Sequence, residues 1–296
     1  MLKRFRFVLS LLLIFSFSTT LFAAESKDAY FPHVQGSYWV YEDQDGNELT
    51  RRAVEKKEIE GKTYHAFNYE PAFEDWADYD YHIHPNFYRI GEEKVTFWVG
   101  DEAEKAVKAH LTKEMEAFLK LLQKMGAPFI MLYNIEIEAQ DPFYALPIPV
   151  TFNEKWKATQ IKAKITLTPV PPQDPPEITL EFTIVETGTV VGRENVETPA
   201  GTFEDCLKIE YRTETEVAAV PSPETGSDPP GESVTTLWVA PNIGIVKLHQ
   251  KAEDIFLKTI STTMPPEVGA LPTVKPPELN LELKKYEVKS ADSGSE

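Results

Sequence analysis

Two segments of alternating side chains, each interrupted by a tight turn, constrain the fold of this chain more than any other feature. The first, V-E-T-P-A-G-T-F-E-D-C-L-K-I-E-Y, runs from Val196 to Tyr211, and the second, T-L-W-V-A-P-N-I-G-I-V-K, runs from Thr236 to Lys247. Pro presets one backbone angle and Gly tolerates positive φ, so Pro199 to Gly201 and Pro241 to Gly244 each predict a turn between two strands. Neither segment contains a nucleophile beside a base, a phosphate-binding loop or a metal-ligand spacing. Both segments therefore predict β-structure rather than a site of chemistry.

The same alternation continues through most of the chain. Ile161 to Thr168 and Ile178 to Ile184 place apolar residues on one face and polar residues on the other, and Asp45-Gly46 predicts a hairpin turn. The proline-rich segments Pro169 to Pro176 and Pro221 to Gly231 predict exposed loops, because clustered prolines exclude both helix and strand. The predicted fold class is mainly β: an antiparallel curved sheet or half-barrel, with two similar halves as an open alternative, and one amphipathic helix packed on it.

That helix is predicted over Glu102 to Met125, where apolar residues recur at intervals of three and four. The apolar stripe consists of Val107, Leu111, Met115, Phe118, Leu119 and Leu122, and the polar face carries Lys105, Lys108, Lys113, Glu114, Glu116 and Lys120. Gly126 and Pro128 predict its end. We expect the helix to cover one open face of the sheet. A membrane-surface or partner helix is the alternative, which the mixed charge of the polar face disfavours.

The first 24 residues have the pattern of an export signal. Lys3, Arg4 and Arg6 form its basic region, Phe7 to Phe17 form its apolar region, and small residues end at Ala24. The apolar run is short for a membrane span, so we expect no transmembrane segment after cleavage, with an uncleaved anchor as the alternative. The predicted localisation is therefore exported, either periplasmic or extracellular.

Net charge and cysteine content further limit the possible binding partners and the possible sources of stability. The formal net charge is −17 at pH 7, and removal of the three basic signal residues lowers it to −20. Such an acidic protein is repelled by nucleic acid and by anionic membrane surfaces. Its only cysteine, Cys206, excludes an internal disulfide and is expected to be a buried strand residue. Stability must therefore come from packing.

We predict one β domain over residues 27–263, with two half-repeats over 30–140 and 141–263 as an alternative. Three pairs of short segments match in the same order: Phe31 to Tyr41 with Ile148 to Ala158, Gly61 to Phe67 with Gly201 to Leu207, and Phe87 to Val95 with Val239 to Lys247. Residues 264–296 are rich in proline and then charged, so they are expected to form an extended or disordered tail.

The segment D-Y-D-Y-H-I-H suggests a metal site. On a strand, Asp78, Asp80, His82 and His84 would share one face, and imidazole with carboxylate suits Zn²⁺. A solvated strand face explains the same pattern equally well. A metal-dependent hydrolase that uses this strand is therefore kept as an alternative function, and no cofactor is expected.

Aromatic residues are dense between Tyr64 and Trp98. Core packing accounts for most of them, but some are expected to line a concave apolar pocket. The candidates for ligand binding are Trp76, Tyr79, Tyr81 and Trp98.

The segments Pro199 to Ile209 and Leu237 to Lys247, together with the upstream G-x-x-W-x-Y from Gly36 to Tyr41, resemble uncharacterised exported bacterial β proteins. These proteins are labelled TapB-like or domains of unknown function. The resemblance covers most of Tyr30 to Thr262. It implies a curved antiparallel sheet distantly similar to the periplasmic lipoprotein carriers of LolA/LolB type, and it implies no activity. The departure is N-E-K-W at Asn153 to Trp156, where such proteins more usually have a Gly before the Trp.

From these observations we expect a non-enzymatic extracytoplasmic protein of the bacterial envelope. It would bind an apolar or amphipathic ligand, such as a lipid, or an envelope protein in the concavity of its sheet. A purely structural envelope or scaffold domain is the further alternative.

Overall fold

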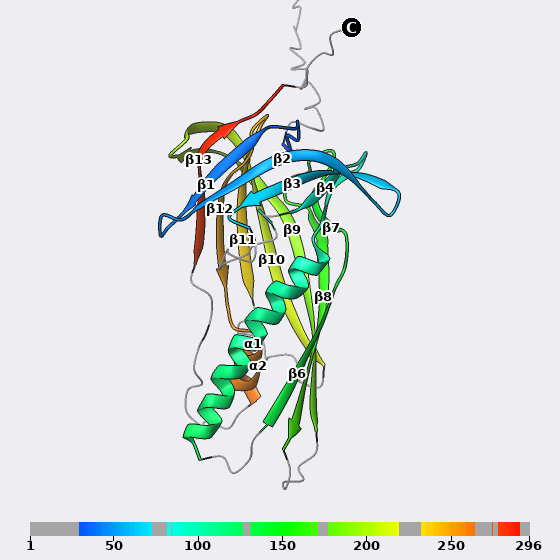
Figure 1. The fold of residues 1–296 in the computed structure, drawn as a ribbon, viewed down its shortest axis with the longest axis vertical. Coiled ribbons are helices and arrows are strands. Elements are labelled where there is room, and N and C mark those ends of the chain that lie inside the picture. The colour runs from blue at the N-terminus through cyan, green and yellow to red at the C-terminus, as the bar shows by residue number, and fades with distance from the viewer. Residues whose placement is uncertain are drawn as a thin grey trace, which may run out of the picture.

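The structure is a computed structural model that describes residues 30–72, 82–83, 85–126, 131–170, 177–218, 232–263, 274 and 278–290. Within these residues the chain forms two helices and thirteen strands (Figure 1). The helices are α1 (Gly100–Lys124) and α2 (Phe256–Thr263). The strands are β1 (Tyr38–Asp43), β2 (Glu48–Ile59), β3 (Lys62–Glu70), β4 (Phe87–Ile90), β5 (Lys94–Trp98), β6 (Met131–Ala139), β7 (Phe143–Pro147), β8 (Lys155–Pro169), β9 (Ile178–Thr198), β10 (Gly201–Ala218), β11 (Ser233–Ala240), β12 (Gly244–Ala252) and β13 (Leu279–Glu287).

All thirteen strands belong to one sheet, in the order β6-β8-β9-β10-β11-β12-β13-β1-β2-β3-β4-β5-β7. Every ladder between neighbours is antiparallel. The predicted fold class, a mainly β protein with a curved antiparallel sheet and a helix packed on it, is confirmed (Figure 1).

The connection between β6 and β7 explains the curvature. These strands stand at opposite ends of the sheet order, yet only Gln140, Asp141 and Pro142 separate them in the chain. A three-residue connection spans about 10 Å at most, so the sheet must curl until its two ends meet. Side-chain bonds then hold β7 beside β8: Trp156 Nε1 donates to the carbonyl of Tyr144 at 2.8 Å, and Thr159 Oγ1 donates to the carbonyl of Gln140 at 3.0 Å.

The sheet contains two meanders of five strands, β1–β5 and β8–β12, in which each strand pairs with the next along the chain. The three pairs of matching segments fall at corresponding places in them: β1 and β8, the starts of β3 and β10, and the β4–β5 and β11–β12 hairpins. This placement agrees with two half-repeats, and the duplication itself stays a prediction.

The strand β13 joins the two meanders, because it pairs with β12 on one side and with β1 on the other. The expectation that everything after residue 263 is an extended or disordered tail was therefore wrong for Leu279–Glu287. These residues alternate as L-N-L-E-L, and the three leucines are buried. The short apolar pattern was hidden by the prolines before it and the charges after it.

The larger of two buried clusters, which we call the aromatic core, contains Trp39, Tyr41, Tyr88, Phe97, Phe143 and Tyr211 together with aliphatic residues of both meanders. The polar groups of its aromatic side chains bond to backbone carbonyls of distant segments. Trp39 Nε1 donates to Ile243 O at 2.7 Å, and the Tyr41 hydroxyl donates to Ile245 O at 2.9 Å. A buried aromatic residue with a polar tip needs such a partner, so these bonds fix how the first meander lies against the second.

The second cluster, which we call the helix-covered core, lies between α1, α2 and the strands β6, β8 and β9. It contains Leu111, Met115, Phe118, Ile135, Ile165, Phe182 and Phe256 with further aliphatic residues. The helix predicted over 102–125 is observed as Gly100–Lys124. Of the predicted apolar stripe, Leu111, Met115 and Phe118 are buried and the other three residues are half-buried, while Gly100 and Ala103 are buried outside the stripe. One member of the predicted polar face, Glu114, is fully buried, for a reason given below.

The turn at Pro199 to Gly201 is confirmed between β9 and β10, and Gly201 has a φ of 131°. Cys206 is fully buried, and burial raises the pKa of its thiol to about 11, with Asp205 and Glu194 acting in the same direction. Its role is therefore packing, as the sequence predicted.

Candidate functional site

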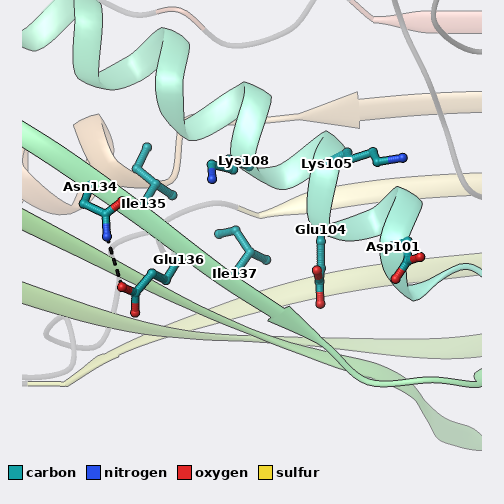
Figure 2. Close-up of a pocket in the computed structure, with 8 residues that line it drawn as sticks. All are labelled: Asp101, Glu104, Lys105, Lys108, Asn134, Ile135, Glu136 and Ile137. Atoms are coloured by element: carbon teal, nitrogen blue, oxygen red, sulfur yellow. Dashed lines mark hydrogen bonds between the residues drawn. The ribbon is translucent and has the colours of Figure 1, made fainter.

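A groove of about 510 Å³ lies between the N-terminal half of α1 and the strand β6 (Figure 2). Four of its lining residues come from the helix and four from the strand. They are Asp101, Glu104, Lys105 and Lys108 of α1, and Asn134, Ile135, Glu136 and Ile137 of β6.

The strand residues of the groove are consecutive, and this decides what the groove is. Successive side chains of a strand point to opposite faces, so a pocket over one face would be lined by alternate residues. A pocket lined by four residues in a row must lie along the edge of the strand. Among the described residues, β6 is a terminal strand of the sheet and pairs only with β8, so the groove follows the edge of β6 that faces away from β8.

The backbone bonds give the direction of each peptide group along that edge. Gln140 N donates to Gln160 O at 3.0 Å, toward β8, whereas Ala139 N donates to Glu104 Oε1 on the helix at 3.0 Å. Backbone direction alternates along an antiparallel strand, so the N–H and C=O groups of Tyr133, Ile135 and Ile137 also face away from β8. These backbone groups therefore point toward the side of β6 on which the groove lies.

The side chains around the groove are both apolar and charged. Ile135 is buried in the helix-covered core, and Ile137 packs against it. On the strand, Asn134 Nδ2 donates to Glu136 Oε1 at 3.0 Å. Figure 2 shows Glu104 reaching from α1 toward the strand, while Lys105 and Lys108 lie along the helix. The groove thus has an apolar side toward the core and charges of both signs at its rim.

The position of α1 beside β6 is set by Asp141, in the corner between β6 and β7. Its carboxylate accepts the backbone N–H groups of Val99 and Gly100 at 3.0 and 2.9 Å, so it caps the helix from outside the helix. Burial raises the pKa of Asp141, while these two backbone bonds lower it. The carboxylate also sits where a Cβ on Gly100 would be, 2.2 Å from its Oδ2, so only glycine fits there.

Of the metal candidates predicted from D-Y-D-Y-H-I-H, only His82 belongs to the described residues; Asp78, Asp80 and His84 lie outside them. His82 and Ile83 form a turn and are both buried, so the expected alternation of a strand face is wrong at these two positions. The cause is the pairing of His82 Nε2 with Glu186 Oε1 of β9 at 2.5 Å, between the rings of Phe143 and Tyr211. A buried imidazole and carboxylate stabilise each other here inside the aromatic core.

Burial raises the pKa of the Tyr211 hydroxyl well above its usual range, and the nearby Glu186 raises it further. The hydroxyl donates to Ala145 O at 2.5 Å. It is therefore a neutral donor to the backbone of β7.

Among the ligand-binding candidates, Trp76, Tyr79 and Tyr81 lie outside the described residues. Trp98 is half-buried at the end of β5, with its ring edge-on to Tyr64 at 5.8 Å between centroids. It does not line the α1–β6 groove.

Sequence reasoning missed both the groove and the role of Glu114. Glu114 accepts the backbone N–H groups of Ile255 and Leu257 at 2.9 and 2.7 Å, so it holds the start of α2. A four-residue spacing from His110 to Glu114 is visible in the sequence. The contact of Glu114 with Ile255 is not visible in the sequence, because the two residues are 141 positions apart.

Residues 131–254 match the family model described as DUF3108-like. The match runs from β6 to the end of β12, so it includes the strand side of the groove and the second meander. No curated protein matches the chain.

Two solved structures are similar to the chain. One is a protein from Bacteroides fragilis NCTC 9343 that is inferred to be exported and has a YmcC-like fold. Its sequence is 15% identical, the similarity covers 88% of this chain and 99% of that chain, and the TM-score is 0.37. The other is a protein from Parabacteroides distasonis ATCC 8503 inferred to be a lipoprotein: 14% identity, 88% of this chain, 98% of that chain and a TM-score of 0.37. A TM-score of 0.37 is too low to assign a shared fold.

Within the described part of the chain, neither helix combines the length and the apolar character needed to cross a membrane.

Proposed function

We propose that this is a non-enzymatic extracytoplasmic protein that binds an extended segment of a partner protein along the free edge of β6. The observation that carries the proposal is the groove lined by four consecutive strand residues, on the side of β6 toward which the backbone groups of Tyr133, Ile135 and Ile137 point. An added strand would pair with these groups, which is how extended peptides bind to exposed sheet edges.

The chemistry of the two faces of β6 selects the partner. On the inner face, Ile135 and Ile137 favour apolar side chains. On the outer face, Glu136 and Glu138 are exposed, and they favour basic side chains opposite them. The net charge of −17 would also speed the approach of a basic partner. The expected segment therefore alternates apolar and basic residues.

Packing argues for the edge over an interior site for a lipid. Leu111, Met115 and Ile165, which lie between α1 and the sheet, are fully buried. In the aromatic core, Phe97 and Phe143 stack at 5.8 Å and Tyr88 and Phe67 stack at 5.3 Å. These contacts within the two cores favour the edge of β6 over the interior as the binding site.

The test is a titration of the ¹⁵N-labelled mature chain with an octapeptide of alternating valine and lysine, followed by NMR. We expect the amide signals of Tyr133, Ile135 and Ile137 to shift and their hydrogen exchange to slow. An octapeptide of the same composition, with its four lysines grouped at one end, should not produce this pattern.

Charge reversal supplies a matched pair of variants. Glu136 and Glu181 both lie opposite Lys164, in the same row and on the same face, but only Glu136 lies on the edge strand. Glu136→Lys should weaken binding of the alternating peptide several-fold, and Glu181→Lys should leave it unchanged. Equal effects of the two variants, or no shifts in β6, would overturn the proposal. So would dodecylphosphocholine micelles shifting residues of the helix-covered core while the peptide shifts none.

A further inference from the structure

A cluster of metal-ligand side chains lies on the other side of α1, where the helix meets the start of α2. His110 and Glu114 come from neighbouring turns of α1, and Asp254 comes from the residues just before α2. The potential ligand atoms of these three residues all lie within 4.8 Å of one another, and His110 Nε2 is 2.8 Å from Glu114 Oε1.

We propose that His110, Glu114 and Asp254 bind a divalent transition-metal cation such as Zn²⁺. Imidazole nitrogens and carboxylate oxygens are both ligands of Zn²⁺ in proteins, and a site with three protein ligands leaves a fourth position open. The proposal is independent of the function proposed for the groove.

Charge favours the cation. Glu114 is fully buried and Asp254 is 7% exposed, so two carboxylates share a space that water reaches poorly. Buried carboxylates attract positive charge, and a cation held between them would supply it. With a neutral imidazole, a dication balances the three ligands.

The hydrogen bonds already present leave room for coordination. Glu114 Oε1 accepts the N–H group of Ile255 and lies 2.8 Å from His110 Nε2, while Glu114 Oε2 accepts the N–H group of Leu257. Asp254 accepts the N–H group of Val274 at 3.1 to 3.2 Å. Coordination by both His110 and Glu114 would replace the direct contact between them. Each carboxylate oxygen has two lone pairs, so it can accept a hydrogen bond and also coordinate a metal. The same bonds fix the orientation of both carboxylates, as outer-shell bonds do in metal sites.

Access is provided by His110, whose side chain is 18% exposed, whereas that of Glu114 is fully buried. A cation entering beside the imidazole would connect α1 to the start of α2, two elements joined here through Glu114. Binding should therefore stabilise the contact between the two helices.

The test uses the untagged mature chain, freed of metal by a chelator and titrated with Zn²⁺ by calorimetry. Bound metal is then counted by elemental analysis after gel filtration. We expect one equivalent to bind, and we expect Co²⁺ in the same site to give a visible absorption band.

His110→Ala and Asp254→Asn should each weaken Zn²⁺ binding at least tenfold. Both variants keep the Glu114 carboxylate that holds α2, and circular dichroism checks that they are folded. The control is His249→Ala, because His249 forms a similar pair with Glu278 at 3.7 Å on the surface, outside the cluster. The proposal is overturned if the wild-type chain binds no Zn²⁺, if His110→Ala binds it as tightly as the wild type, or if His249→Ala abolishes binding.

Discussion

The aromatic core and the helix-covered core are built on the same sheet by different means. In the aromatic core, strands of the two meanders pack on each other, and ring hydroxyls and indole N–H groups reach backbone carbonyls on distant strands. In the helix-covered core, α1 and α2 cover one face of β6, β8 and β9. There, the carboxylates of Asp141 and Glu114 accept backbone N–H groups at the starts of α1 and α2.

This difference indicates which region of the molecule is open to a binding partner. The aromatic core includes the other terminal strand, β7, where the side chains of Trp156 and Tyr211 bond the carbonyls of Tyr144 and Ala145. A helix covers a sheet without pairing with its edge, so the edge of β6 stays open next to α1. We therefore assign stability chiefly to the aromatic core and binding to the region around α1.

The largest expected effect tests the aromatic core. Trp39→Ala removes a ring that is 1% exposed together with its bond to Ile243, so it should lower the free energy of unfolding by about 4 kcal/mol. Urea unfolding followed by circular dichroism measures this. The control is Trp238→Ala on a half-buried ring of β11, with an expected cost of about 1 kcal/mol. Equal costs would contradict the assignment of stability to the aromatic core.

A smaller effect tests the start of α1. Gly100→Ala places a methyl group against the Asp141 carboxylate, so the cap must move, at a cost of about 2 kcal/mol. We expect faster hydrogen exchange in the first turns of α1, with the aromatic core unchanged. Gly192→Ala is the matched control, because its added Cβ meets no atom within 4 Å. If hydrogen exchange instead becomes faster throughout the sheet, the aromatic core and the helix-covered core are not independently stable.

The smallest effect concerns pH. Burial first, then His33 and Lys56, lower the pKa of His65 from its ordinary value near 6.5 to about 4. Between pH 6.5 and pH 4, His65 therefore binds a proton in the unfolded chain but not in the folded chain. The free energy of unfolding must fall as the pH drops through this range.

Because the His65 ring is partly exposed, we discount the full shift and expect a loss of about 1 kcal/mol. Comparing urea unfolding of the wild type and His65→Gln at pH 7 and pH 4.5 measures it. His65→Gln should lose less stability than the wild type over this range, and the surface variant His249→Gln should behave like the wild type. An equal loss in the wild type and His65→Gln would show that other groups set the pH dependence.

Much of the fold could be predicted because it depends on local sequence patterns. The alternation from Ile161 to Thr168, the turn at Pro199 to Gly201 and the three-and-four spacing of Leu111, Met115 and Phe118 each need only near neighbours in the chain. The strand β13 was missed because its pattern is short and lies between prolines and charges.

The candidate sites could be predicted much less. The D-x-D-x-H-x-H pattern gave no sign that His82 turns inward, since its partner Glu186 is 104 residues away. The groove depends on which strand ends the sheet, and no residue of β6 reveals this by itself.

The sequence by itself determined most of the strands, the main helix, the turn at Pro199 to Gly201 and the acidic charge, because backbone preference and side-chain periodicity act over a few residues. The tertiary structure alone decided that β13 joins the two meanders, that β6 keeps a free edge and that His110, Glu114 and Asp254 meet. These features depend on contacts between distant segments, and such contacts form only when the sheet curls and the helices pack on it.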